Sequence, residues 1–261
     1  KKGLLYKGYT IQPYSPAAGT GLSSHELNQP GTYKIVKDTT IVAQFKAIEN
    51  EKSKFIFDKA DAPVYFLAWT TTPWTLVSNT AVAVHPEVNY VVLEIEADGD
   101  KERIVVAEEL AEKFSKEGKV LATFLGKDLE RETYSRPFNL VEIEEAHYIV
   151  LAEYVTTEDG TGLVHQAPAF GADDYQTCKK YALPVVNPVL PNGHFEQSIS
   201  IVGGMFFKEA DKILIKDLKS RGLMFKHEQF EHTYPHCWRC HTVLIYYAQP
   251  SWYIRTTQIT D

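Results

Sequence analysis

Cysteine is scarce in this sequence: the chain of 261 residues contains three, Cys178, Cys237 and Cys240. An odd, low number without a secretion signal is typical of proteins kept in a reducing compartment, so we expect a cytoplasmic protein. The chain also lacks any apolar run near the roughly 18 residues that cross a bilayer, and we expect no membrane partner. A core of this size holds together without disulfides or bound metal.

Positive charge is lacking as well. Lys and Arg number 27 against 34 Asp and Glu, which gives a formal net charge of −7 at pH 7. Proteins that bind a long duplex through many phosphates are usually basic, so the net negative charge argues against an extensive nucleic-acid-binding surface. It still allows one flexible nucleic-acid end to bind in a local pocket.

The common nucleophile and phosphate motifs are absent. The sequence has no Gly-x-Ser-x-Gly elbow, no Gly-x-x-x-x-Gly-Lys loop and no His-Glu-x-x-His pair. If the protein hydrolyses a substrate, we therefore expect water to be the nucleophile.

Short segments rich in Val, Ile, Tyr and Phe, separated by turn residues, predict a majority of strands. These segments are 39–47, 64–69, 81–84, 90–95, 103–106 and 148–151. Helical spacing of apolar residues predicts helices over 106–116, 172–181 and 209–221. We expect an α+β fold with a small barrel, formed by residues 37–225 between an N-terminal connector, 1–36, and a C-terminal connector, 226–261. Because the chain begins with Lys1 and not with Met, we interpret it as a piece of a longer protein.

A threonine-rich segment follows the predicted strand 64–69. Thr70, Thr71 and Thr72 precede Pro73, and the residue before a proline avoids the helical region, so the strand ends here. Thr72 can then cap a short helix with Pro73 in its first position. Hydroxyls beside free backbone N–H groups suit an ester carbonyl or a ribose. The alternative is structural, because threonine is common at strand ends and helix caps.

A second polar segment runs from Gly160 to Tyr175. His165 lies near the end of a short predicted strand, and Asp173 and Asp174 lie in the first turn of the next helix. Taken singly, the two aspartates would interact favourably with the positive end of the helix dipole. The histidine alone is typical of a partly buried side chain whose hydrogen bonds are satisfied. Nine residues apart across a strand, a turn and a helix, His165 and Asp174 are placed to face one pocket.

Together these segments resemble the editing insertion of the class I synthetases for isoleucine, valine and leucine. Valyl and leucyl enzymes usually carry Thr-Thr-Arg-Pro, whereas this chain has Thr71-Thr72-Pro73-Trp74, which favours the isoleucyl family. His165 after Gly160-Thr161-Gly162 is also isoleucyl-like. So is the C-terminal motif series Tyr234-Pro235-His236-Cys237-Trp238-Arg239-Cys240, Leu244-Ile245-Tyr246 and Pro250-Ser251-Trp252.

The resemblance implies a role for each matching residue, with Asp174, Thr72 and His165 as the catalytic set. Asp174 would hold the ammonium group of a misattached amino acid, and His165 would help exclude isoleucine. Thr70, Thr71 and Thr72 would surround the ester and the terminal adenosine. Further substrate-binding candidates are Trp74 as a wall, Asn79 and Asp173.

The implied activity is hydrolysis of Val-tRNA(Ile) in a β-barrel-like editing domain. The implied partners are the tRNA(Ile) 3′ end carrying valine and the rest of a parent synthetase, with the protein monomeric. Neither His-x-Gly-His nor Lys-Met-Ser-Lys-Ser occurs here, so we expect ATP and Mg²⁺ to be used only by a synthetic core outside this chain. Two alternatives stay open: a module that only binds the acceptor end, and a valyl enzyme that clears threonine.

A zinc site is the cofactor question that the sequence raises. The family often has a Cys-x-x-Cys near its N-terminal connector, but the matching positions here are Ser15 and Ala18. Cys237 and Cys240 remain, and zinc needs about four ligands. Although His232, His236 or His241 are near in sequence, adjacent residues rarely all point inward, and we expect no zinc and no other cofactor.

Overall fold

The computed structural model describes residues 3–57, 62–97 and 99–256. Its strands are β1 Leu5–Ser15, β2 Thr20–Gly21, β3 Tyr33–Ala47, β4 Val64–Thr70, β5 Ala81–Val84, β6 Asn89–Ala97, β7 Asp100–Ala107, β8 Lys119–Leu125, β9 Tyr134–Ser135, β10 Tyr148–Leu151, β11 Leu163–Gln166, β12 Met224–Pro235 and β13 Ile245–Ile254. Its α-helices are α1 Ser24–Leu27, α2 Lys54–Phe57, α3 Ala111–Phe114, α4 Ala172–Lys180 and α5 Phe207–Ser220. Short 3₁₀ helices span Pro73–Ser78 (η1), Glu108–Leu110 (η2) and Gly126–Leu129 (η3).

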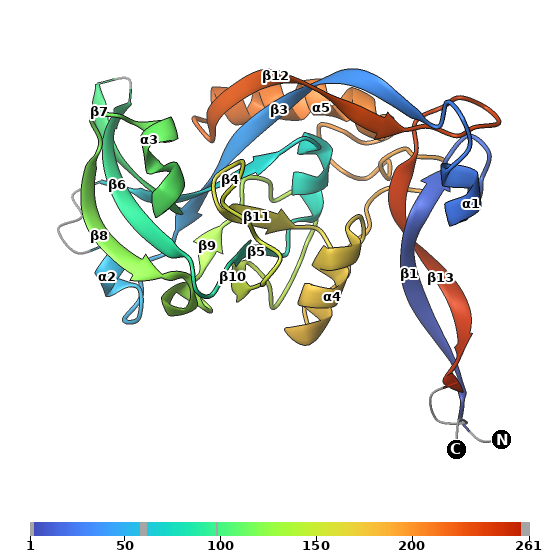
Figure 1. Ribbon diagram of the computed structural model, residues 1–261, viewed down its shortest axis with the longest axis horizontal. Helices are drawn as coiled ribbons and strands as arrows, with labels where there is room; N and C mark the ends of the chain where they lie inside the picture. Colours follow the sequence, from blue (N-terminus) through green and yellow to red (C-terminus); the bar gives the residue numbers. More distant parts are fainter. Residues whose placement is uncertain (1–2, 58–61, 98, 257–261) are drawn as a thin grey trace.

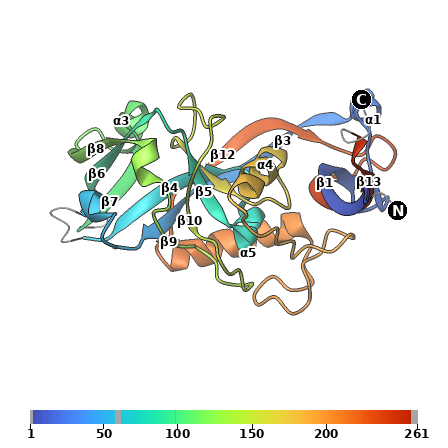
Figure 2. The same cartoon turned by 90° about the horizontal axis from the view of Figure 1, so that it is seen from below.

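Three sheets organise the described chain. The largest has the order β12-β3-β4-β7-β6-β8, with β9 paired to β3, and a smaller sheet has the order β10-β5-β11. A third sheet, β13-β1-β2, is a long ribbon that projects from the end of the molecule opposite β6, β7 and β8 (Figures 1 and 2). Its main strands pair antiparallel, from Leu5 opposite Ile254 to Tyr14 opposite Ile245.

The α+β class predicted from the sequence is confirmed, but the described strands do not close into a barrel. β12 and β8 stand at the two ends of the large sheet's strand order and are not paired with each other. The physical reason lies after β4, where Pro73 stops the strand and η1 carries the chain out of the large sheet. The next strand, β5, therefore builds a separate sheet with β10 and β11.

The central strand β4 is covered on both faces, which makes it a rigid base for the threonine-rich segment at its end. Phe66 packs into the main core, which it shares with Val82 of β5 and Val105 of β7. Leu67 points to the opposite face, where it packs with Val42 and others. Phe66, Leu67, Val82 and Val105 are completely buried. Since burial of an aliphatic or aromatic side chain contributes about 1.5–3 kcal/mol, the position of the strand end is strongly determined.

Most predicted elements are confirmed: each predicted strand segment lies in β3, β4, β5, β6, β7 or β10, and two predicted helices match α4 and α5. The predicted helix 106–116 is wrong in extent. β7 continues to Ala107, and only η2 and the single turn α3 follow it. Leu110 and Phe114 do share a face, but pairing with β6 holds residues up to Ala107 in the sheet.

The predicted connectors contain regular strands. The pair of β3 with β12 runs from Met224 opposite Ala43 to Pro235 opposite Tyr33, so it crosses both predicted domain boundaries, 36/37 and 225/226. The boundaries themselves stay predictions. Among the described helices, none has the length and apolar character needed to span a membrane.

The turn before β11 generates a stability prediction that separates steric clash from backbone strain. Gly160 and Gly162 both have positive φ, +75° and +77°. A Cβ on Gly162 would lie 2.3 Å from Ala107 Cβ, whereas a Cβ on Gly160 would meet Trp69 Cβ at an ordinary 3.5 Å. We expect Gly160→Ala to lower the free energy of unfolding by about 1–2 kcal/mol and Gly162→Ala by about 3–5 kcal/mol, because overpacking adds to the strain. Urea denaturation measures both, and equal losses would contradict the close packing of this turn on β7.

Candidate functional site

One cavity gathers the two polar segments that the sequence singles out. It has a volume of about 290 Å³ and lies between the end of β4, the start of η1, β11 and the start of α4. Its lining residues are Trp69, Thr70, Thr71, Thr72, Thr75, Val164, His165, Ala167, Phe170 and Asp174. The structure therefore brings together the predicted Thr70, Thr71, Thr72, His165 and Asp174, and it places Trp74, Asn79 and Asp173 outside the lining.

Threonine hydroxyls form a continuous row along one wall. Thr70 Oγ1 accepts from the backbone N–H of Thr72 at 3.1 Å and lies 3.4 Å from Thr72 Oγ1. Thr72 Oγ1 lies 3.3 Å from Thr75 Oγ1. β4 ends at Thr70, shortly before Pro73, and the three side chains line the cavity.

The expectation that the Thr72 side chain caps the following helix is wrong. Thr72 does occupy the residue before η1, with Pro73 in the first turn, but its side chain makes no capping hydrogen bond. The backbone N–H of Trp74 instead donates to Asp211 Oδ1 of α5 at 2.8 Å. The cap comes from a distant helix, which sequence spacing does not reveal.

His165 closes one side of the cavity as a neutral ring. It is 8% exposed, and burial lowers its pKa to about 4, so it carries no charge at pH 7. The side-chain amide of Asn79 lies 3.4 Å from Nδ1 and can only donate there, which leaves the proton on Nε2. Nε2 donates to Thr75 Oγ1 at 2.8 Å, and that hydroxyl donates to the carbonyl of Thr72 at 2.8 Å. Both ring nitrogens are engaged, which favours a positioned wall over a proton-transfer group.

Asn79 lies one layer behind the cavity and is completely buried. Its Nδ2 also donates to the carbonyl of Ala81 at 2.8 Å, and its Oδ1 accepts from the Tyr134 hydroxyl at 2.7 Å. Tyr134 is almost completely buried, and desolvation raises its pKa well above its ordinary value, so it stays a donor. Asn79 therefore orients His165 without touching the cavity.

Asp174 supplies the one acidic side chain of the lining. Its Oδ2 accepts from the backbone N–H of Ala167 at 2.8 Å, which turns the carboxylate back from α4 towards β11. Burial, with a smaller contribution from nearby Asp173, raises its pKa to about 6. Gly171 permits this geometry, because a Cβ there would lie 2.7 Å from Asp174 Oδ2. Asp173 is exposed to solvent on the neighbouring surface of α4.

Trp74 is a core residue behind the wall. It is 3% exposed and packs against Phe170 at 4.6 Å and Phe207 at 4.9 Å between ring centroids. Phe170 and Trp69 provide the aromatic lining of the cavity that was expected from Trp74. The sequence did not single out Thr75, Phe170 and Trp69 as site residues, although their positions inside or beside the two polar segments are a signal that could have identified them.

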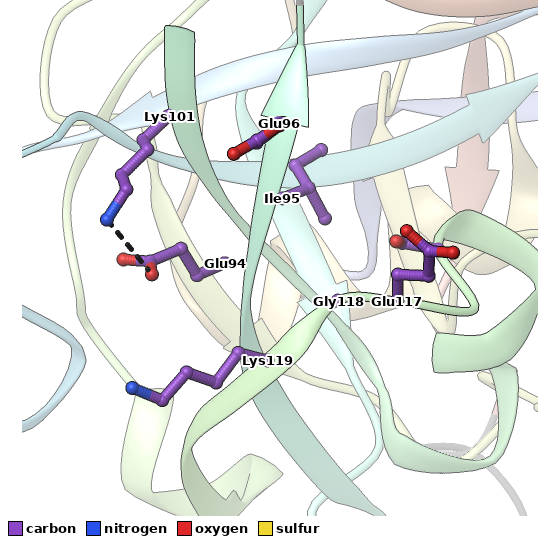
Figure 3. A pocket seen from close by; sticks show the side chains of 8 residues that line it. Glu94, Ile95, Glu96, Lys101, Glu117, Gly118 and Lys119 are labelled. Carbon is purple, nitrogen blue, oxygen red and sulfur yellow. Dashed lines mark ion pairs between the residues drawn. The ribbon is translucent and has the colours of Figure 1, made fainter.

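A second, charged cavity shares no residue with these motifs. It has a volume of about 340 Å³ beside β6, β7 and β8, and its walls include Glu94, Lys101, Glu117 and Lys119. Lys101 Nζ lies 3.6 Å from Glu94 Oε1 (Figure 3). The lining carries three glutamates and two lysines, and a single serine in place of a row of hydroxyls.

The residues around Cys237 and Cys240 do not fit a zinc centre. Cys237 is buried, and Cys240 Sγ lies 3.6 Å from Ser15 Oγ and 3.1 Å from Thr242 Oγ1. Cys240 is exposed; slight desolvation acts to raise its pKa, but hydrogen bonds with Thr242, Ser15 and Cys237 lower it to about 7. Within the described residues, no group of three or more His, Cys, Asp or Glu side chains is arranged to hold a metal ion. The absence of a cofactor stays a prediction.

The hydrogen bonds of His165 generate a spectroscopic prediction. Nitrogen-15 NMR of the imidazole, assigned with a His165→Gln variant, is expected to show the Nε2-protonated neutral ring at pH 7 and titration near pH 4, because burial disfavours the imidazolium. A Nδ1-protonated ring, or titration near pH 6.5, would contradict the arrangement.

Comparisons with known proteins identify relatives of this chain. No family model matches the sequence. The isoleucine–tRNA ligases of Streptomyces avermitilis and Thermus thermophilus are 55% identical over 263 residues and 44% identical over 261 residues. Each alignment covers the whole of this chain, which spans 24% of each relative's length.

Solved structures agree on the fold. The GlLeuRS-CP1 structure has a TM-score of 0.58 at 20% identity, over 73% of this chain and 98% of that one. The editing domain of cytosolic leucyl-tRNA synthetase from P. knowlesi has a TM-score of 0.54 at 13% identity, over 75% and 97%. Over its whole length the chain therefore corresponds to a segment of the isoleucine–tRNA ligases, about a quarter of their length, and it shares its fold with these leucyl-tRNA synthetase editing domains.

Proposed function

We propose that this domain hydrolyses the ester that links a wrongly attached valine to tRNA(Ile). The observation that carries the proposal is a single cavity with a row of threonine hydroxyls on one wall and the carboxylate of Asp174 on another. An aminoacyl ester offers the matching groups: a ribose and a carbonyl at one end and an ammonium at the other.

Asp174 would bind the ammonium in a charge-assisted hydrogen bond. Its Oδ2 is held by Ala167 N–H, so the carboxylate needs little reorganisation when the substrate arrives. Thr70, Thr71 and Thr72 would hold the ester and the ribose, with water as the nucleophile. Since both His165 nitrogens are engaged in hydrogen bonds, the acceleration would come from holding the ester and the water in place.

His165 would limit the size of the amino acid side chain. A methylene in an apolar pocket is worth about 1–3 kcal/mol, a limit established with the isoleucyl enzymes themselves, so one binding site separates valine from isoleucine poorly. A second, smaller cavity that refuses isoleucine sterically adds the missing discrimination. The ring is suited to this because Asn79 and Thr75 hold it from both nitrogens.

The partners of the proposed reaction are the 3′ end of tRNA(Ile) carrying valine and the rest of a parent synthetase. That parent would join isoleucine to tRNA(Ile) with ATP and Mg²⁺ at a core outside this chain, in the cytoplasm and as a monomer. The net charge of −7 agrees with contact to one acceptor end and not to a long duplex.

Replacement of the Asp174 carboxylate tests the anchoring role. Asp174→Asn keeps an acceptor for Ala167 N–H but loses the charge, so we expect kcat/KM for Val-tRNA(Ile) deacylation to fall about 30- to 1000-fold, the range for a lost partner of a buried charge. Asp173→Asn is the matched control, because Asp173 is exposed outside the cavity, and it should retain most activity. Comparable losses in the two variants would remove Asp174 from its special role.

The pH dependence of the wild-type protein follows from the same group. The pKa of Asp174 is raised to about 6, so the carboxylate is ionised at pH 7 and becomes protonated as the pH falls through 6. We expect kcat/KM to level off near pH 7 and to fall about tenfold per pH unit well below 6. A profile that stays flat to pH 4.5 would contradict an anionic anchor.

Substrate choice separates the proposed activity from its alternatives. The domain should deacylate Val-tRNA(Ile) and spare Ile-tRNA(Ile), while His165→Ala should admit Ile-tRNA(Ile) and raise its cleavage about tenfold or more, since a blocking side chain is removed. Tight binding of Val-tRNA(Ile) without turnover would favour a binding module, and preference for Thr-tRNA(Val) would favour a valyl-type site.

A further inference from the structure

The row of hydroxyls from Thr70, Thr72 and Thr75, here called the threonine wall, adjoins a helix that is capped by a carboxylate from outside the cavity. η1 begins at Pro73, which has no N–H, so Trp74 carries the first backbone N–H of this short helix. That group donates to Asp211 Oδ1 at 2.8 Å, from a helix 137 residues further along the chain. Asp211 belongs to α5, which also packs on η1 through the contact of Phe207 with Trp74.

A threonine at the N-cap position, directly before a helix, ordinarily turns its hydroxyl towards the N–H groups of the first turn. Thr72 has the right position for this, and its carbonyl already accepts from Thr75 N–H at 3.0 Å. Its hydroxyl nevertheless stays with Thr70 and Thr75, 3.4 Å and 3.3 Å away, on the cavity wall. Because Asp211 satisfies Trp74 N–H, the Thr72 hydroxyl is not needed as a cap.

Asp211 lies near charged side chains at the junction of α5, β3 and β12. Lys208, one turn earlier on α5, binds Asp38 of β3 at 2.7 Å, and Asp38 also accepts from His232 Nε2 of β12 at 3.0 Å. Lys208 lowers the pKa of Asp211, but burial outweighs it and raises that pKa to about 7. A carboxyl group with this cost of burial is stabilised by its backbone hydrogen bond, whose donor, Trp74 N–H, lies two residues after Thr72.

We propose that Asp211 is a positioning residue for the editing site: it caps η1 in place of Thr72 and so keeps the Thr72 hydroxyl available to the substrate. The inference rests on the proposed hydrolysis of the aminoacyl ester and adds to it a residue from α5. Without Asp211, the Thr72 hydroxyl would rotate to cap Trp74 N–H and leave the wall.

A double-mutant cycle on deacylation of Val-tRNA(Ile) tests the coupling. Asp211→Ala and Thr72→Val should each lower kcat/KM about five- to thirtyfold, the scale of one cap or one hydrogen bond. If Asp211 acts through Thr72, the double variant should lose no more than the larger single loss. Losses that multiply would overturn the proposal, as would wild-type activity in Asp211→Ala.

The conservative variant provides a separate test. Asp211→Asn keeps Oδ1 as an acceptor for Trp74 N–H and should stay within about twofold of the wild type, whereas loss of activity in this variant would overturn the proposal even if Asp211→Ala fails to fold. Asp217→Ala is the matched control on the same helix, since it removes a surface acid paired with Arg221 and should leave deacylation unchanged. A comparable loss in Asp217→Ala would attribute the effect to α5 stability and overturn the assignment.

Hydrogen exchange separates this inference from the proposed reaction. The Trp74 amide should be protected in the wild type and in Asp211→Asn, and should exchange at least about tenfold faster in the Asp211→Ala/Thr72→Val double variant, because neither capping acceptor remains. A crystal structure of Asp211→Ala should show the Thr72 hydroxyl turned to η1. These results would support the cap even if no deacylation were found, whereas an unprotected Trp74 amide in the wild type would overturn it while leaving the proposed reaction untouched.

Discussion

The site depends on the interruption of strand β4 at Pro73. A strand that stops inside a protein leaves backbone and side-chain polar groups without ladder partners, and buried polar groups need partners. Here the chain meets this need with Thr70, Thr72 and Thr75 hydroxyls, with His165 and with a carboxylate from α5. Apart from Asp211, which lies outside the lining, the groups that satisfy the broken strand also surround the cavity.

Rigidity distinguishes this arrangement from an ordinary strand end. β4 is covered on both faces, and Asn79, buried behind His165, is tied to Tyr134 and Ala81. A pocket that distinguishes two side chains differing by a single methylene needs rigid walls, since the difference in binding free energy is only about 1–3 kcal/mol. A neutral ring held at both nitrogens meets that requirement better than a charged ring exposed to water.

Much of the site could be predicted from the sequence because it is local. Thr70, Thr71, Thr72, His165 and Asp174 lie in two segments whose strand–turn–helix patterns place them near element ends, and the structure brings them to one cavity. Taken separately, each segment was better explained by a structural role than by a function. Their meeting depends on β5, which comes after η1 and pairs with β11.

The features that could not be predicted depend on contacts between distant segments. Asp211 is one acid on an amphipathic helix, and no spacing links it to Trp74. The Trp74 ring was expected in the wall, but a large apolar side chain gains more by packing between Phe170 and Phe207. The helix expected over 106–116 was shortened because Ala107 pairs with Tyr90 in the sheet. In each case tertiary packing outweighed the local pattern.

The most direct test of the account is the structure of the domain with a non-hydrolysable analogue of valyl-adenosine. The account predicts the ammonium within hydrogen-bond distance of Asp174, the ribose and carbonyl along the row from Thr70 to Thr75, and the valine side chain against His165. An analogue bound outside this cavity, or inside it with the ammonium turned away from Asp174, would contradict the central claim.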